Sequence, residues 1–333
     1  MGSMSQDTNP AFAPTLSDQV SIEEAGPDQF QSRYYPSRMG NAADIAYGGC
    51  ALGVGLRSAC QTVPPQYVLY SATGSFLAPV STSFHLQCSV RRLRDTRTFA
   101  TRQVEITQKQ KDNTTRLCMI ILADFQREAE ESLLAYSTPP TREYSPPDEC
   151  ESSFEAGENM VEKGQLPKES LMLYKSLFGL MNRFFEFRQA PEGIAAHNLS
   201  GVAKHRQSNQ DQLHLTSKTS ADWFRSRQPA LGQQDQHAGF IFMMDGFLSF
   251  LPLAHSKMFL DDAAACSSLD FALRLFAVDL NLNDWNLREL RTISGGNGRT
   301  YSEARVWNQE GKLIANMTQQ SVLRPKQTSK ALL

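Results

Sequence analysis

Four segments in the first half of the chain alternate between apolar and polar residues, and short polar breaks separate them. β-Branched and aromatic residues are frequent in these segments, a pattern typical of half-buried β-strands. The predicted strands run over 67–77, 82–93, 98–108 and 115–126. A glycine- and alanine-rich segment at 46–63 precedes them. We expect it to be a helix, since small side chains let a sheet pack closely around it.

The second half repeats this order of elements. An apolar segment at 237–254 is predicted to be the helix, and 171–189 to hold a short helix followed by the first strand of this half. The later predicted strands run over 267–277, 285–294, 299–309 and 312–324. A glycine-bearing turn, NQEGK, separates the last two and is typical of a hairpin.

Two short stretches mark the correspondence between the halves. RTFATRQV at 97–104 and RTYSEARV at 299–306 both begin Arg-Thr-aromatic and end in Val. Each coincides with the third of the four strands predicted after the helix of its half. We interpret the chain as a tandem duplication; the alternative is that two unrelated amphipathic hairpins share a motif by chance.

The predicted organisation is two units joined by a linker. The units span 17–127 and 179–325, and the linker spans 128–178. The acidic, Pro- and Ser-rich composition of 128–170 favours an extended or partly disordered chain. Segments 1–16 and 326–333 are predicted to be flexible termini. The fold class is therefore α+β, with two antiparallel sheets, each wrapped around a central helix and joined edge to edge.

Composition narrows the classes of function. There are 33 Lys and Arg residues against 35 Asp and Glu, a formal net charge of −2, so the basic excess typical of nucleic-acid-binding proteins is missing. The six cysteines include no C-x-x-C pair and the histidines show no metal spacing, so neither a metal site nor a disulfide framework is predicted. The sequence has no signal-peptide core, no membrane-span pattern and no SKL ending. We expect an intracellular, cytoplasmic protein without a cofactor, with a peroxisomal location as the alternative.

Several motifs resemble the acyl-CoA thioesterase II family. They are YGGCALGVGLRSACQTVP, GSFLAP, VRRLRDTRTFATRQVEITQ and ADFQ in the first unit and GKLIANMTQQSVLR in the second. The resemblance covers residues 17–127 and 180–325. Family members are oligomeric double hotdogs that hydrolyse fatty acyl-CoA. The resemblance therefore implies a double hotdog fold, an acyl-CoA substrate and a homo-oligomer.

The resemblance also implies catalytic residues. The family holds the attacking water with an Asp, a Thr and a Gln, which correspond to Asp245, Ser268 and Gln319 of this chain. Ser267 replaces Ser268 if the register slips by one, and an ordinary polar strand face is the alternative for either. From the residues alone, Gln319 is a polar side chain on a mostly apolar strand face and needs partners if buried. Asp245 lies in an apolar segment, where a carboxylate is paired, solvated, shifted in pKa or a helix N-cap.

A second group of residues is expected to bind the substrate: Gly48, Gly49, Cys50, Arg94 and Arg97. The glycines lie at a predicted helix start, where backbone N–H groups can hold an oxyanion. The arginines would bind the phosphates of CoA, or lie on a solvated strand edge. Cys50 follows the glycines at a position where the helix dipole lowers a thiol pKa, so a covalent mechanism is an alternative to simple packing.

Hydrolysis of an acyl-CoA thioester is the leading function. Two motifs depart from the family pattern: GSFLAP lacks the usual basic residue after FL, and SSLDFAL lacks a His after the Asp. These departures leave open a specialised homologue that acts on an unusual acyl substrate, such as a polyketide, by hydrolysis, dehydration or cyclisation. A non-catalytic acyl-ligand carrier is the third possibility.

Overall fold

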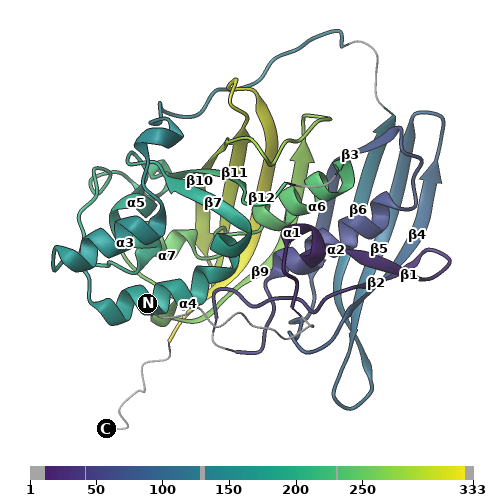
Figure 1. The fold of residues 1–333 in the computed structure, drawn as a ribbon, viewed down its shortest axis with the longest axis horizontal. Helices are drawn as coiled ribbons and strands as arrows, with labels where there is room; N and C mark the ends of the chain where they lie inside the picture. Colours follow the sequence, from purple (N-terminus) through teal and green to yellow (C-terminus); the bar gives the residue numbers. More distant parts are fainter. Residues whose placement is uncertain (1–11, 42, 128–131, 230–231, 327–333) are drawn as a thin grey trace.

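One continuous antiparallel sheet dominates the computed structural model, which describes residues 12–41, 43–127, 132–229 and 232–326 (Figure 1). The strand order within these residues is β1-β2-β4-β5-β6-β3-β9-β12-β11-β10-β8-β7. The first half supplies β1 (Ile22–Gly26), β2 (Gln29–Ser32), β3 (Tyr67–Phe76), β4 (Leu86–Asp95), β5 (Phe99–Lys109) and β6 (Thr115–Arg127). The second supplies β7 (Phe185–Gln189), β8 (Ser220–Ser226), β9 (Ala263–Leu275), β10 (Asn286–Gly296), β11 (Arg299–Trp307) and β12 (Leu313–Pro325).

The two halves meet where β3 pairs with β9, in a register that places Ala72 opposite Leu273. All eight strands predicted from alternation are present, with ends that differ by a few residues. In β12 the buried positions include Ala315, Met317 and Gln319, which share one face as the period of two requires. The edge-to-edge double hotdog is therefore confirmed.

Two central helices lie side by side against the sheet, α2 (Gly48–Cys60) and α6 (Gln233–Met244) (Figure 1). They approach closely because their contact is made of small residues. A Cβ added at Gly53 would lie 3.2 Å from the Ala238 carbonyl oxygen and 2.8 Å from a Val20 methyl group. The largest buried cluster fills the space between these helices and the sheet.

The second apolar segment, predicted as one helix over 237–254, is in fact broken. α6 ends at Met244, and a short helix, α7 (Leu251–His255), begins seven residues later. Phe247 adopts a left-handed conformation with φ of 84°, which a right-handed helix cannot contain. The chain therefore turns directly after Asp245, at the point where the candidate site lies.

The prediction of an extended or partly disordered linker is also partly wrong. Residues 128–170 contain the 3₁₀ turn η1 (Pro147–Glu149), α3 (Ser153–Glu162) and the first residues of α4 (Lys168–Phe184). α4 and β7 confirm the helix and the strand expected within 171–189. α3 begins with a capping box formed by Ser152 and Glu155, a local signal that the bulk composition hides. Tyr174 and Phe178 of α4 are buried in a second apolar cluster with Phe250, so this region forms a helical layer over the second half of the sheet (Figure 1).

Shorter elements complete the described chain: α1 (Leu16–Gln19), α5 (Ile194–Asn198), η2 (Leu199–Gly201), η3 (Leu215–Ser217) and η4 (Leu260–Asp262). Ala13 and Leu16 lie in the segment predicted to be a flexible terminus, yet both are buried. Residues 1–11 and 327–333 of the predicted termini, and 128–131 of the predicted linker, lie outside the described residues. None of the described helices is long and apolar enough to cross a membrane.

Candidate active site

Asp245 lies between the ends of the two central helices. It is the C-cap of α6, with φ of −67° and ψ of −17°, and its carboxylate accepts a hydrogen bond from the backbone N–H of Gly49 in the first turn of α2. The N-cap interpretation is therefore wrong, because Asp245 ends its own helix. Its carboxylate instead accepts a hydrogen bond at the N-terminus of α2, where backbone N–H groups lack partners within the helix.

Two glycines make this junction possible. A Cβ added at Gly48 would lie 2.8 Å from Oδ2 of Asp245, and one added at Gly49 would lie 2.4 Å from the carbonyl oxygen of Phe242. Either contact would force the two helix ends apart. The glycines predicted to bind substrate thus have a first role in bringing α2 against the carboxylate.

Gln319 is the second partner of this carboxylate. Its Nε2 donates to Oδ1 of Asp245 over 2.7 Å, and both residues are buried. Burial raises the pKa of Asp245 to about 6, while the hydrogen bonds from Gln319 and from the Gly49 N–H oppose the rise. Within the described chain, Asp245 has no ion pair with a Lys, Arg or His. The result is a carboxylate that is ionised near neutral pH yet basic enough to take a proton.

Ser268 lies on the same sheet face, one step away from this pair. It is opposite Ser321 of β12, and Ser321 is two residues from Gln319 on the same face. The register of β9 against β12 shifts between Gln320 and Ser321, so a bulge lies between the Ser268 pair and the Gln319 pair. Ser267 is opposite Val322 and belongs to the other face, so the register favours Ser268. No hydrogen bond between described residues joins Ser268 to Asp245 or Gln319.

Sequence reasoning missed further polar residues in this neighbourhood. Thr300 and Ser302 of β11 are opposite Ser321 and Gln319, and all four side chains are buried. The hydroxyls of Thr300, Ser302 and Ser321 have no hydrogen-bond partner among the described residues, and neither has Oε1 of Gln319. The sequence did hold a signal for this row of polar side chains. The NQEGK turn sets the register of the hairpin, and that register pairs RTYS of one strand with TQQS of the next.

A pocket of about 400 Å³ opens beside the first turn of α2. Gly48, Ser268 and Phe76 line it, and most of its remaining wall is apolar. Gly48 is the lining residue next to Asp245, since a Cβ added there would lie 2.8 Å from Oδ2 of that carboxylate. We call this space the Ser268 pocket.

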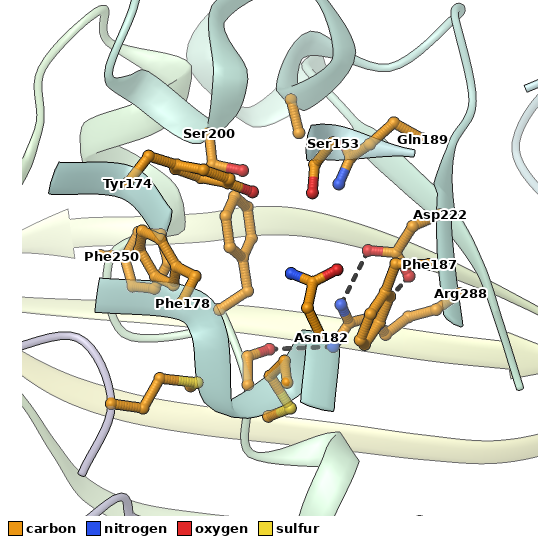
Figure 2. A pocket seen from close by; sticks show the side chains of 15 residues that line it. Ser153, Tyr174, Phe178, Asn182, Phe187, Gln189, Ser200, Asp222, Phe250 and Arg288 are labelled. Atoms are coloured by element: carbon orange, nitrogen blue, oxygen red, sulfur yellow. Dashed lines mark hydrogen bonds and ion pairs between the residues drawn. The ribbon is translucent and has the colours of Figure 1, made fainter. Parts of the chain in front are cut away.

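A second pocket lies behind Gly246, the residue after Asp245, and is lined mainly by the second half of the chain (Figure 2). At its base, Arg288 forms a buried bidentate ion pair with Asp222, with distances of 3.0 Å from Nε to Oδ1 and 2.7 Å from Nη2 to Oδ2. A third bond, from Nη1 of Arg288 to the carbonyl oxygen of Gly246, measures 3.0 Å. The ion pair therefore holds the backbone that carries Asp245. We call this space the Gly246 pocket.

Cys50 does not match its predicted roles as a nucleophile or a substrate contact. Its thiol is buried and points to the carbonyl oxygen of Ser37 at 3.6 Å, and it lines neither pocket. Burial raises the pKa of Cys50 to about 12, which outweighs any lowering by the helix dipole. The side chain packs in the core.

Arg94 and Arg97 lie far from Asp245. Arg94 pairs with Asp124 at 3.6 Å, and Arg97 is exposed in the turn between β4 and β5. Arg102 ties this hairpin to Thr62, just beyond the C-terminal end of α2. Since the 13 residues of α2 span about 20 Å, the structure does not bring these arginines together with the reacting groups at its N-terminus.

Tyr47 holds the helix junction from the other side. Its hydroxyl donates to the carbonyl oxygen of Phe242 over 2.7 Å. Burial and the nearby Asp245 raise the pKa of Tyr47, so it stays a neutral donor. No cluster of three His, Cys, Asp or Glu residues suited to a metal ion exists in the part of the chain that the structure describes.

Comparison with known proteins identifies the family of this chain. Residues 35–126 match the acyl-CoA thioesterase N-terminal domain and residues 177–323 match the acyl-CoA thioesterase C-terminal domain. The acyl-CoA thioesterase II TesB2 of Mycobacterium marinum is 18% identical, with a TM-score of 0.65, and the match covers 93% of this chain and 98% of that one.

Two further solved structures share the fold. The tesB protein of Mycobacterium avium subs paratuberculosis is 15% identical, with a TM-score of 0.67 and coverage of 93% and 98%. A conserved hot dog protein of unknown function from Alicyclobacillus acidocaldarius is 14% identical, with a TM-score of 0.65 and coverage of 94% and 98%. Together the two domain matches span most of the sequence, and the chain belongs to the acyl-CoA thioesterase family.

Proposed function

We propose that the protein hydrolyses an acyl-CoA thioester with a water molecule held by Asp245, Gln319 and Ser268. One observation carries this proposal: the buried carboxylate of Asp245, bonded by Gln319 at 2.7 Å, has a pKa of about 6, and Gly48 beside it lines a pocket. A general base works best when its pKa lies near the working pH. Membership of the acyl-CoA thioesterase family supplies the class of substrate.

The reaction follows from these groups. Asp245 takes a proton from water as the water oxygen bonds to the thioester carbonyl carbon. The C=O π electrons move to the carbonyl oxygen, and the tetrahedral intermediate collapses with cleavage of the C–S bond. The proton held by Asp245 then passes to the sulfur of CoA, which leaves as a thiol, and the acyl group leaves as a carboxylic acid. Gln319 fixes the carboxylate, and Ser268 holds the water from the opposite strand.

The first turn of α2 stabilises the charge that forms on the carbonyl oxygen. Gly48 borders the Ser268 pocket there, and the N-terminal end of a helix carries a partial positive charge. The absence of a Cβ lets a carbonyl oxygen approach the backbone. Removing a single oxyanion donor from an enzyme that performs acyl transfer costs about 10²–10³-fold in kcat.

The test is release of free CoA thiol from a panel of acyl-CoA esters by wild type, Asp245→Asn, Gln319→Ala and the double variant. Asn keeps the size of Asp but cannot take a proton, so we expect a loss of about 10²–10⁴-fold. The double variant should be little worse than either single variant, because the two residues act as a unit. Near wild-type hydrolysis by Asp245→Asn would refute this mechanism. A changed acyl product without thiol release would indicate a different reaction in the same site.

A further inference from the structure

The Gly246 pocket combines aromatic walls with polar groups that converge on one space. Figure 2 shows the side-chain ends of Ser153, Asn182 and Gln189 directed into the space bordered by the rings of Tyr174 and Phe178. These residues come from α3, α4 and β7. Three separate elements thus place hydrogen-bonding groups around one small apolar chamber.

These polar groups are not fully used by the protein itself. Oε1 of Gln189 is buried and has no hydrogen-bond partner among the described residues. Tyr174 is buried beside the hydroxyls of Ser153 and Ser200, and hydrogen bonds with them oppose the rise in its pKa that burial causes. A buried acceptor without a partner costs free energy, so a donor group on a ligand would be favoured there.

Charge and size restrict the ligand further. The charged residues of the lining are Asp222 and Arg288, which neutralise each other. The pocket volume is about 60 Å³, and since a water needs about 10–15 Å³ on this measure, it has room for about four to six groups of that size. A neutral, compact group fits this space, and a long alkyl chain does not.

The pocket adjoins the chain segment that carries the reacting carboxylate. Gly246 lines it, and Gly246 directly follows Asp245. Met39 borders the same pocket, and Ala46, a few residues later, borders the Ser268 pocket. Asp245 thus has a wall residue of the Gly246 pocket next to it in the chain, and Gly48 of the Ser268 pocket beside its carboxylate.

We propose that the Gly246 pocket receives the acyl group and selects short, neutral acyl groups that carry a hydroxyl group. Asn182 and Gln189 bind that hydroxyl, and the rings of Tyr174 and Phe178 pack against the carbon skeleton. This inference rests on the proposed thioester hydrolysis and names its substrate class. A site built to hydrogen-bond a substrate hydroxyl rejects an analogue without it far more strongly than a purely apolar site does.

Matched substrates and near-isosteric variants test this inference. The substrates are butyryl-CoA and hexanoyl-CoA, their 3-hydroxy derivatives and palmitoyl-CoA. The variants are Asn182→Leu and Gln189→Met, which remove the hydrogen-bonding groups but keep the side-chain size. The backbone bonds at both positions remain, from Nε of Arg227 to the Asn182 carbonyl and from the Gln189 N–H to Glu151. Gln103→Met on β5 makes the same chemical change away from both pockets.

We expect wild type to prefer at least one hydroxylated ester over its plain partner by ~10-fold or more in kcat/KM. Either pocket variant should reduce that preference to within about threefold, and Gln103→Met should retain it. Equal or better hydrolysis of the plain esters by wild type, a preference for palmitoyl-CoA, or a preference unchanged in both variants would overturn the inference while leaving hydrolysis intact. If wild type hydrolyses no ester of the panel, the proposed function fails and the inference fails with it.

Discussion

The C-terminal ends of α2 and α6 are equivalent places in the two repeats, yet they differ in chemistry. Gln61 caps α2 with φ of −67° and ψ of −18°, almost the same backbone as Asp245 at the end of α6. Each cap contacts the first turn of the other helix, since Nε2 of Gln61 donates to Gln234 over 2.7 Å and Asp245 accepts from Gly49. The two repeats therefore have the same backbone arrangement at the C-terminal end of the central helix.

The paired strands of the two repeats also differ in chemistry: the first repeat has apolar residues where the second has polar ones. Ala100 and Ser302 are the fourth residues of the two repeated stretches, and they are opposite Phe125 and Gln319, respectively. Phe125 thus occupies in the first repeat the place that Gln319 holds in the second. Gln61 is exposed, so a carboxylate there would be solvated and ordinary. Burial and an amide partner, rather than backbone geometry, make one junction suited to catalysis.

The largest effect we expect comes from filling the space at the α2 N-terminus. In Gly48→Ala the new Cβ would lie 2.8 Å from Oδ2 of Asp245 and from Cε1 of Phe76. Asp245 must move away, and we expect hydrolysis to fall by about 10²-fold or more, since small misplacements of reacting groups have costs of that size. Gly179→Ala is the control, because its Cβ meets nothing within 4 Å inside α4, and it should stabilise the fold by about 0.5–1 kcal/mol. Wild-type turnover by Gly48→Ala would show that the close approach of Gly48 to the Asp245 carboxylate is not needed for hydrolysis.

The second effect compares ion pairs in the two repeats. Asp222→Asn leaves Arg288 buried without its countercharge, so we expect a loss of about 3–5 kcal/mol in the free energy of unfolding. Asp28→Asn breaks the exposed pair with Arg92 in the first repeat and should cost about 1 kcal/mol or less. Urea unfolding of both variants measures the difference. Equal losses would show that the Asp222 pair is not needed to hold the Gly246 backbone.

The third effect is a dependence of stability on pH. It should arise from Asp245 at the end of α6 and not from Gln61 at the end of α2. Because Asp245 has its pKa raised from 3.8 to about 6, the folded protein binds the proton more tightly than the unfolded chain does. Stability contributed by the protonated form is therefore lost as the pH rises from about 4 to about 6, by at most about 3 kcal/mol. Asp245→Asn should remove this slope, and Gln61→Asn should leave it unchanged, in thermal melts between pH 4 and 7.

Activity should move in the opposite direction over the same range. The general base must be ionised, so kcat/KM is expected to rise about tenfold per pH unit below pH 6 and to level off above it. Gln319→Leu removes a bond that favours the charged form, so the midpoint should move to higher pH. A midpoint near pH 4 in wild type would show that the carboxylate is solvated during the reaction.

The sequence was informative where local patterns decide the structure. Alternation located the strands, and the repeated R-T-aromatic stretch indicated the duplication that the pairing of β3 with β9 completes. Gln319 stood out as a polar residue on an apolar face and is indeed buried against Asp245. These signals lie within a few residues along the chain, so they are readable without tertiary structure.

Other features depend on contacts between distant segments and could not be derived in this way. The break after Asp245 follows from the left-handed Phe247, and the partners Arg288 and Asp222 lie 66 positions apart along the chain. The polar row of Thr300 and Ser302 becomes visible only when β11 is placed beside β12. The proposed catalytic roles and the homo-oligomer remain predictions.

The smallest effect should come from Cys50, the third residue of α2. The third residue of α6 is Asp235, which pairs with Arg57, so the two helix starts are chemically unlike. With its pKa raised to about 12, the Cys50 thiol is almost entirely protonated at neutral pH and cannot act as a thiolate. Cys50→Ala should keep turnover within a few-fold while lowering stability modestly, because one buried sulfur is lost from a packed position. Steady-state thiol release and thermal melts measure the two effects separately. A loss of about 10²-fold or more with an unchanged melting temperature would instead assign the chemistry to a covalent acyl-cysteine and remove the role proposed for water at Asp245.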